Sequence, residues 1–178
     1  MNVRKGIYLV GLAGSGKTTL GKKLSDHLKY TFIDLDQEIE RKEGKSIPEI
    51  FNTQGEGNFR IMERELLHEI AGEQDGFVMA TGGGTPCYHF NMDTMNDHGI
   101  TIYLDVSPGD LAIRVMDAGI ENRPMFRSYD HQDLIQEIRD MKEVRDEFYD
   151  QAQIKIKDNQ ITMEMIVSHL ESLGYFKS

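Results

Sequence analysis

The sequence has few of the features of secreted or membrane proteins. Its 178 residues include one cysteine, Cys87, and no tryptophan. A single cysteine excludes an internal disulfide and is typical of a reducing compartment. No apolar run approaches the roughly 18 residues of a membrane span, and residues 1–6 lead into an apolar strand pattern without room for a signal peptide. We therefore expect a cytoplasmic protein with no membrane partner.

Positive charge is also scarce. The chain carries 20 Lys and Arg against 30 Asp and Glu, so its formal net charge is −10 at pH 7. Such a surface repels a nucleic-acid backbone, and we expect no nucleic-acid partner. An anionic small molecule would need a local cluster of positive groups. The length suits one compact domain over residues 1–178.

A glycine-rich loop at residues 11–18, GLAGSGKT, fits the phosphate-loop pattern G-x-x-x-x-G-K-S/T. The apolar run 6–10 before it predicts a strand, and the amphipathic run 17–28 after it predicts a helix, which is the setting of this motif. Bare glycine backbone lets N–H groups wrap a polyphosphate. Lys17 can reach the β- and γ-phosphates, and the Thr18 hydroxyl can ligate Mg²⁺. The alternative, a glycine-rich turn with an incidental lysine, does not explain the flanks.

Strand and helix patterns alternate along the whole chain. The alternation predicts an α/β protein in which helices cover both faces of a parallel sheet. Ligands of such sheets bind at the carboxyl ends of the strands, so the residues that follow strands are the candidates for function. The expected strands are residues 6–10, 31–34, 77–80, 101–105 and 154–157.

Two acids, Asp34 and Asp36, follow the second expected strand. They project the same way if the strand continues. Near a phosphate loop, a carboxylate can hold Mg²⁺ through water or accept a proton from an attacking hydroxyl. The alternative is that one of them only caps the helix expected at residues 37–43. The pattern favours neither interpretation.

Two further segments are also open to two interpretations. Arg60 and Glu63 share one face of a helix expected at residues 56–71. A surface ion pair is the simpler account, and an arginine oriented by Glu63 to bind a substrate carboxylate is the alternative. Three consecutive glycines, Gly82 to Gly84, cost folding entropy, which favours close contact of backbone with a ligand over a plain turn.

Residues 117–126 carry Gly and Pro without clear periodicity, which indicates a lid loop with Arg123 at its tip. On closure, this arginine could stabilise the transferring phosphoryl group, whereas the alternative is an ordinary solvated loop. The helix expected at residues 132–149 carries Arg145 and Tyr149. Periodicity does not single out Arg145, because charged residues on such helices are usually solvated.

Taken together, these segments resemble shikimate kinase along nearly the whole chain. The resemblance implies a P-loop kinase fold of three layers, α/β/α, with a five-stranded parallel sheet, a helical substrate-binding segment at about 34–63 and a lid at about 117–130. The motifs that carry it are GLAGSGKTT at 11–19, FIDLD at 32–36 with Ile39-Glu40, SIPEIF at 46–51, Gly55-Glu56 with Phe59-Arg60 and Glu63, the glycines 82–84, Arg123-Pro124, and Arg145 with Tyr149.

The resemblance implies a monomeric enzyme that transfers the γ-phosphate of ATP to the 3-hydroxyl of shikimate. The products are shikimate 3-phosphate and ADP, on the route to chorismate and the aromatic amino acids. The implied catalytic residues are Lys17, Asp36 as the base, and Arg123. The implied ATP contacts are Gly14, Ser15, Gly16, Lys17, Thr18, Thr19 and Arg123. The implied shikimate contacts are Asp36, Arg60, Gly82, Gly83, Gly84 and Arg145, of which Arg60 and Arg145 grip the carboxylate. Mg²⁺ is implied at Thr18 and, through water, at Asp34.

The chain departs from the family pattern at three places. Residues 85–88, TPCY, follow the glycine run where the family has small or apolar residues, and Met125-Phe126 stands where it has leucines. A residue or two more precedes Arg123, so the adenine-facing arginine is left open, with Arg114 as a candidate.

Other P-loop proteins are the rival interpretations. A gluconate kinase is not expected to combine the aspartate pair with Arg60 and Arg145, and an adenylate or nucleoside kinase needs a site for a second base. A GTPase switch needs N-K-x-D and D-x-x-G stretches, and the sequence contains neither.

Overall fold

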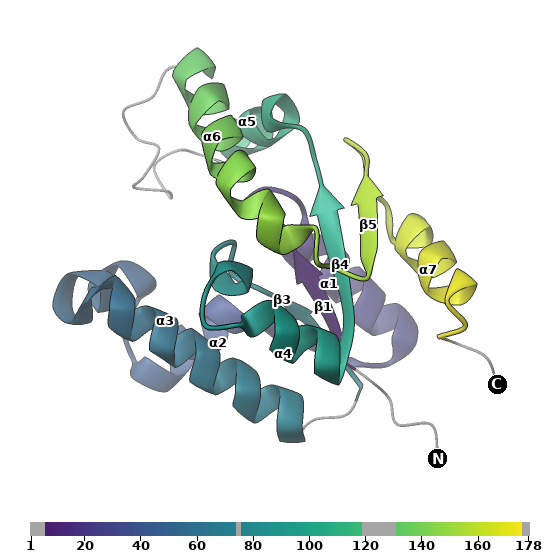
Figure 1. Ribbon diagram of the computed structural model, residues 1–178, viewed down its shortest axis with the longest axis horizontal. Helices are drawn as coiled ribbons and strands as arrows, with labels where there is room; N and C mark the ends of the chain where they lie inside the picture. The colour runs from purple at the N-terminus through teal and green to yellow at the C-terminus, as the bar shows by residue number, and fades with distance from the viewer. Residues whose placement is uncertain (1–5, 74–75, 119–130, 176–178) are drawn as a thin grey trace.

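The computed structural model describes residues 6–73, 76–118 and 131–175. Its centre is a five-stranded sheet in the order β2-β3-β1-β4-β5, and every pair of neighbours is parallel (Figure 1). The strands expected from the sequence all form, and only β4 differs, because it begins two residues early. The strands are β1 (Gly6–Val10), β2 (Thr31–Asp34), β3 (Phe77–Ala80), β4 (Gly99–Asp105) and β5 (Ile154–Lys157).

Alternate residues of the buried strands face two separate apolar clusters, one on each face of the sheet. Ile7 and Leu9 of β1 pack with α1 and α7, whereas Tyr8 and Val10 pack with the helices of the other face. This period of two produces the expected three layers, which confirms the α/β/α architecture. The helices are α1 (Lys17–Leu28), α2 (Leu35–Glu43), α3 (Ile47–Glu73), α4 (Asn91–His98), α5 (Pro108–Asp117), α6 (His131–Tyr149) and α7 (Met163–Ser172).

The long helix α3 is continuous except at Gly55, whose φ of 81° and ψ of 163° lie outside the helical region. Ser46 and Glu49 form a capping box at the start of α3, because the backbone N–H and the hydroxyl of Ser46 donate to Glu49 at 2.8 and 2.7 Å. The expected second helix, from residue 56, is the part of α3 after the break. Glycine permits the break because a positive φ carries no Cβ penalty there.

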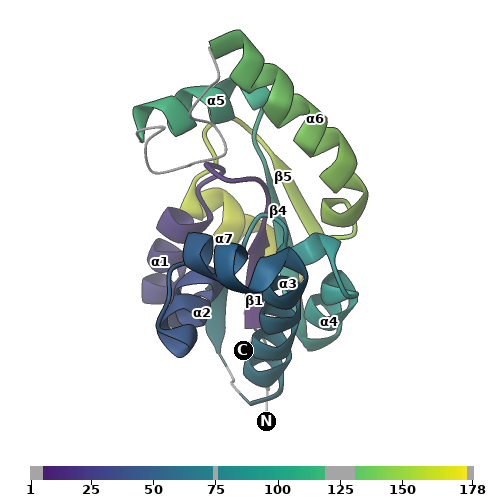
Figure 2. The same ribbon diagram turned by 90° about the vertical axis from the view of Figure 1, so that its left-hand side faces the viewer.

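Helices α5 and α6 pack together at the end of the sheet to which the strands point, in both views (Figures 1 and 2). Ser107 caps α5, since its hydroxyl accepts from the Asp110 amide at 3.3 Å. Within the described residues, no helix has the length and apolar character needed to span a bilayer.

Candidate active site

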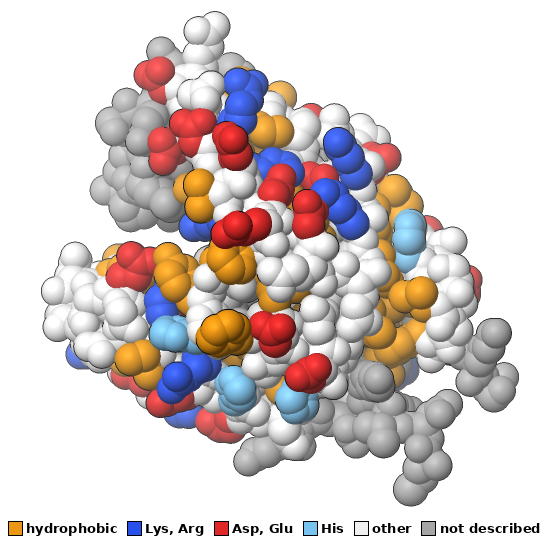
Figure 3. Space-filling model, viewed as in Figure 1, with side chains coloured by type: hydrophobic (Ala, Val, Ile, Leu, Met, Phe, Trp, Pro, Cys, Tyr) orange, Lys and Arg blue, Asp and Glu red, His pale blue; other side chains and the backbone are white. Residues whose placement is uncertain are grey.

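A pocket of about 350 Å³ opens at the carboxyl ends of the strands, where ligands of parallel sheets bind. Figure 3 shows the molecular surface hollowed between the part formed by α3 and the part formed by α5 and α6. Most of the lining comes from the glycine loop, from the start of α2 and from the chain after β3. The lining residues are Ala13, Gly14, Gly16, Lys17, Thr18, Thr19, Asp34, Asp36, Thr81, Gly82, Gly83, Arg114 and Ala118.

The glycine loop between β1 and α1 has the backbone that a phosphate site needs. Gly11, Gly14 and Gly16 have φ values of 141°, 86° and 100°, which L side chains rarely adopt. Gly16 is also the N-cap of α1, and no side chain caps that helix start. The first amides of α1 therefore point toward the pocket without a competing side-chain acceptor, which makes the loop an anion site.

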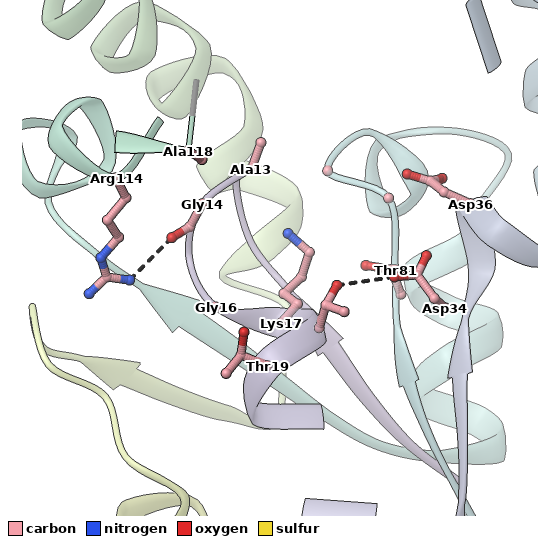
Figure 4. A pocket seen from close by; sticks show the side chains of 13 residues that line it. Ala13, Gly14, Gly16, Lys17, Thr19, Asp34, Asp36, Thr81, Arg114 and Ala118 are labelled. Atoms are coloured by element: carbon pink, nitrogen blue, oxygen red, sulfur yellow. Dashed lines mark hydrogen bonds between the residues drawn. The ribbon is translucent and has the colours of Figure 1, made fainter. Parts of the chain in front are cut away.

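Lys17 is largely buried, at 9% exposure, and its ammonium is held inside the loop. Its Nζ donates to the carbonyl oxygens of Gly11 and Leu12 at 2.7 and 2.9 Å. Figure 4 shows the Lys17 side chain between Arg114 on one side and the two aspartates on the other. The loop thus fixes one positive charge in the middle of the pocket.

Asp34 caps α2 and also accepts a hydrogen bond from the first turn of α1. Its Oδ1 accepts from the Gln37 amide at 3.3 Å, which caps α2, while its Oδ2 accepts from the Thr18 hydroxyl at 3.0 Å (Figure 4). The strand does not continue to Asp36, because this cap starts α2 at Leu35, two residues before the expected helix start. Asp36 is therefore presented by the first turn of a helix.

Asp36 has an unusual electrostatic environment. Burial raises the pKa of its carboxyl to about 6, and the nearby charges of Glu63 and Asp34 act in the same direction, against Lys17 and Arg60. Its Oδ1 is buried and has no hydrogen-bond partner among the residues that the structure describes. Such an atom is costly unless a ligand satisfies it, so the site is suited to a hydroxyl group.

The glycine run 82–84 touches three of the predicted substrate residues. A Cβ on Gly82 would lie 2.8 Å from Oδ1 of Asp36. A Cβ on Gly83 would lie 3.1 Å from Nη1 of Arg145. A Cβ on Gly84 would lie 2.7 Å from both terminal nitrogens of Arg60. The run therefore brings together side chains from α2, α3 and α6, and only glycine allows the close approach.

The ion pair of Arg60 and Glu63 is not a surface pair. The two side chains are 11% and 1% exposed, and Nη1 of Arg60 donates to Oε2 of Glu63 at 2.6 Å. Burial lowers the pKa of Arg60, but Glu63 and Glu56 outweigh it and leave the pKa raised. Glu63 also accepts from the Thr85 hydroxyl at 2.6 Å. The guanidinium is thus held in a fixed orientation beside the glycine run.

Helix α6 reaches the glycine run through Tyr149, which is fully buried. Its hydroxyl donates to the Gly83 carbonyl at 2.5 Å. One turn earlier on the same helix, Arg145 contacts the same glycine. The sequence could not reveal this contact, because Tyr149 and Gly83 lie far apart in the chain.

The opposite wall of the pocket is formed by Arg114 of α5. Its Nη1 donates to the Gly14 carbonyl at 3.1 Å, and its Nη2 donates to the Asn159 carbonyl. The predicted lid begins at the end of α5, but its residues 119–130, including Arg123, lie outside the described part of the chain.

The sequence interpretation missed two threonines near the glycine run. Thr81 lines the pocket and donates to the Leu9 carbonyl at 3.0 Å, while Thr85 binds Glu63. Threonine in a short loop after a strand carries no spacing signal, so only the fold identifies them.

An anion-binding loop beside a pocket with arginines and a buried carboxyl, on a five-stranded parallel sheet, defines a P-loop kinase of a small molecule. A sequence model of the shikimate kinase family matches residues 13–173. The chain belongs to the shikimate kinase family and is an ATP-dependent kinase of the route to aromatic amino acids.

Individual relatives agree with this assignment. A shikimate kinase of Phocaeicola vulgatus is 40% identical over 155 residues, which are 87% of each chain. The crystal structure of a Bacteroides thetaiotaomicron shikimate kinase superimposes with a TM-score of 0.88 at 38% identity, over 97% of this chain and 99% of that one. A shikimate kinase of Acinetobacter baumannii, solved in complex with shikimate, gives a TM-score of 0.81 at 34% identity, over 98% and 96% of the chains.

Proposed function

We propose that this pocket transfers the γ-phosphate of ATP to the 3-hydroxyl of shikimate, with Asp36, Arg60 and Arg145 as its substrate residues. The observation that carries the assignment is the glycine run 82–84, which contacts all three of these side chains at once. An acid that also carries a hydroxyl group fits these side chains, because two guanidinium groups and a carboxyl share the glycine run, and one oxygen of that carboxyl lacks a partner among the described residues.

Arg60 and Arg145 bind the carboxylate of the substrate from two different helices. A guanidinium matches a carboxylate in a bidentate manner, which fixes the plane of the acid as well as its position. The local positive charge also overcomes the net charge of −10 that the whole chain carries. The acid is thereby oriented with one hydroxyl toward Asp36, and the backbone of the glycine run forms the wall of the pocket.

Asp36 accepts the proton of the attacking hydroxyl. A pKa of about 6 leaves this carboxyl ionised at neutral pH and makes it a stronger base than an ordinary aspartate. The hydroxyl oxygen forms a bond to the γ-phosphorus, the bond from that phosphorus to the bridging oxygen of ADP breaks, and the hydroxyl proton passes to a carboxylate oxygen of Asp36. Atoms and charge then balance with ADP as the leaving group.

The phosphates of ATP bind residues 14–19, where the amides of the loop and the Lys17 ammonium neutralise their charge. Thr18 and Asp34 hold Mg²⁺, which supplies charge stabilisation to the phosphates when it is bound. Their oxygens lie 3.0 Å apart at the pocket, and Mg²⁺ is usually bound by one or two such groups together with phosphate and water. Arg114 faces the nucleoside end, and Arg123 adds a second cation to the transferring group.

The remaining features extend the proposal to the whole chain. Residues 34–63 form the substrate-binding segment, and residues 117–130 form the lid of a single domain, 1–178. The protein acts as a cytoplasmic monomer on a small-molecule substrate, without a nucleic-acid or membrane partner.

A panel assay tests the proposed substrate. ADP release is measured with shikimate, gluconate and AMP, and we expect turnover with shikimate alone. Turnover of gluconate or AMP without turnover of shikimate would overturn the proposal. Arg60→Ala should raise the KM for shikimate about 10- to 100-fold and leave the KM for ATP unchanged, because it removes charged hydrogen bonds to the carboxylate. Arg64→Ala is the matched control, since Arg64 lies on the same helix and is 42% exposed.

A further inference from the structure

We propose that Tyr88 is a positioning residue, which fixes the plane of the Arg60 guanidinium at the substrate pocket and so sets the affinity for the acidic substrate. The inference rests on the proposed function in one respect, namely that Arg60 binds the substrate carboxylate. Tyr88 stands at the last of the positions, 85–88, where the chain departs from the family pattern.

The ring of Tyr88 lies against the guanidinium of Arg60. The Cζ atom of Arg60 is 4.3 Å from the centroid of this ring, compared with 5.2 Å from the centroid of the Phe59 ring. Tyr88 is itself 39% exposed, so its ring stands between the buried guanidinium and solvent. A cation at this distance from an aromatic ring is attracted by the ring quadrupole, and the attraction is stronger where the cation is desolvated.

The Tyr88 hydroxyl closes a ring of contacts through Glu56. It donates to Oε1 of Glu56 at 3.4 Å, and the same oxygen accepts from Nε and Nη2 of Arg60 at 3.3 and 3.0 Å. Glu56 is 54% exposed, so its pair with Arg60 alone would be a weak restraint. The hydroxyl contact is long, and the ring contact therefore contributes the larger part of the restraint.

The backbone holds Tyr88 in place. Its carbonyl accepts from the Asn91 amide at 3.0 Å, and the Asn91 side chain donates to the Thr85 carbonyl at 2.9 Å. The next two residues, His89 and Phe90, have φ values of 51° and 59°, which are uncommon for residues other than glycine. A strained turn that immediately follows Tyr88 is more typical of a functional segment than of an ordinary connection.

The orientation of Arg60 matters because most of its donors are already used. One N–H of Nη1 binds Glu63, while the Nε N–H and one N–H of Nη2 bind Glu56. The one remaining N–H on each terminal nitrogen has no partner among the described residues. Two such donors suit a carboxylate only while the guanidinium plane is fixed, and the Tyr88 ring is the contact that restrains this plane from the solvent side.

Steady-state kinetics of three variants tests the inference. Tyr88→Ala and Tyr88→Leu should raise the KM for shikimate about three- to tenfold, because both lose the ring contact. Tyr88→Phe keeps the ring and should stay near the wild-type KM. The kcat and the KM for ATP should remain near the wild-type values in all three variants. Phe90→Ala is the matched control, since Phe90 is 83% exposed in the same turn.

Three results would overturn the inference. The first is a KM for shikimate in Tyr88→Leu equal to that of the wild type, and the second is a KM in Tyr88→Phe as high as in Tyr88→Ala. The third is that Tyr88→Ala raises the KM for shikimate by the same factor when Arg60 is already alanine. If Tyr88→Ala does not fold, the Leu and Phe variants carry the comparison. If Arg60→Ala leaves the KM for shikimate unchanged, the proposed function fails as well, whereas a large Arg60 effect without a Tyr88 effect refutes this inference alone.

Discussion

Replacement of Asp36 by asparagine should stabilise the free protein and abolish its turnover. Burial and the charges of Glu63 and Asp34 hold the pKa of the Asp36 carboxyl at about 6, against a usual value of 3.8. A difference of this size corresponds to about 3 kcal/mol between the charged and neutral forms, and it is an upper bound for a partly exposed group. Asparagine keeps the shape of the side chain and removes the charge that causes this cost.

The pH dependence of stability follows from the direction of this pKa shift. Because the pKa is raised in the folded state, the folded protein binds more protons than the unfolded chain between pH 3.8 and about 6. The contribution of Asp36 to stability is therefore fully present below pH 3.8 and is lost as the pH rises through about 6. Asp36→Asn should exceed the wild type by about 1 to 3 kcal/mol at pH 8 and match it near pH 4.

Urea denaturation at several pH values, with ADP release on the same samples, provides the measurement. Exposed Asp97 supplies the control variant, Asp97→Asn, which should show no such pH-dependent gain. The burial argument is refuted if Asp36→Asn has no higher free energy of unfolding than the wild type at pH 8, or if the difference is the same at every pH. A near-normal kcat refutes the role of Asp36 as the base. In the wild type, kcat/KM for shikimate should fall below pH about 6, as the carboxyl becomes protonated.

Two further variants test the walls of the pocket. Gly84→Ala should raise the KM for shikimate severalfold with little change in Tm, because the new Cβ would lie 2.7 Å from the terminal nitrogens of the flexible Arg60 side chain. Gly57→Ala is the control, since a Cβ there would meet nothing within 4 Å. Equal KM values for the two variants would contradict the reasoning. Thr18→Val removes the hydroxyl that lies 3.0 Å from Asp34, and it should raise the Mg²⁺ concentration for half-maximal activity about tenfold; an unchanged Mg²⁺ titration would exclude Thr18 as a ligand.

Most of the fold could be predicted from local patterns. The five strands and the loop at residues 11–18 were identifiable because a buried parallel strand is an apolar run and a phosphate loop needs glycines at a fixed spacing. The local pattern left the role of the acids at the end of β2 undecided, and the structure shows that Asp34 caps a helix there. An aspartate suits both a strand that continues and a helix that starts after it, and the tertiary contact with Thr18 is not visible in the local sequence.

The candidate site was only partly predictable for the same reason. The resemblance to a known family nominated Arg145, but the residues themselves did not distinguish it from a solvated arginine. Glu63 and Arg60 could equally have been a surface pair, and their burial at 1% and 11% depends on the packing of α3 against the glycine run. No local sequence pattern points to Thr85, to Tyr88 or to the contact of Tyr149 with Gly83.

The amino-acid sequence by itself determined the alternation of strands and helices and the place of the phosphate loop, because both depend on short-range periodicity and on glycine backbone. The tertiary structure alone decided which charged side chains meet. Helices α2, α3 and α6 supply Asp36, Arg60 and Arg145 from separate parts of the chain, and the glycine run is their common contact. Burial at that contact raises the Asp36 pKa and fixes the arginines, and burial is a property of the packed molecule.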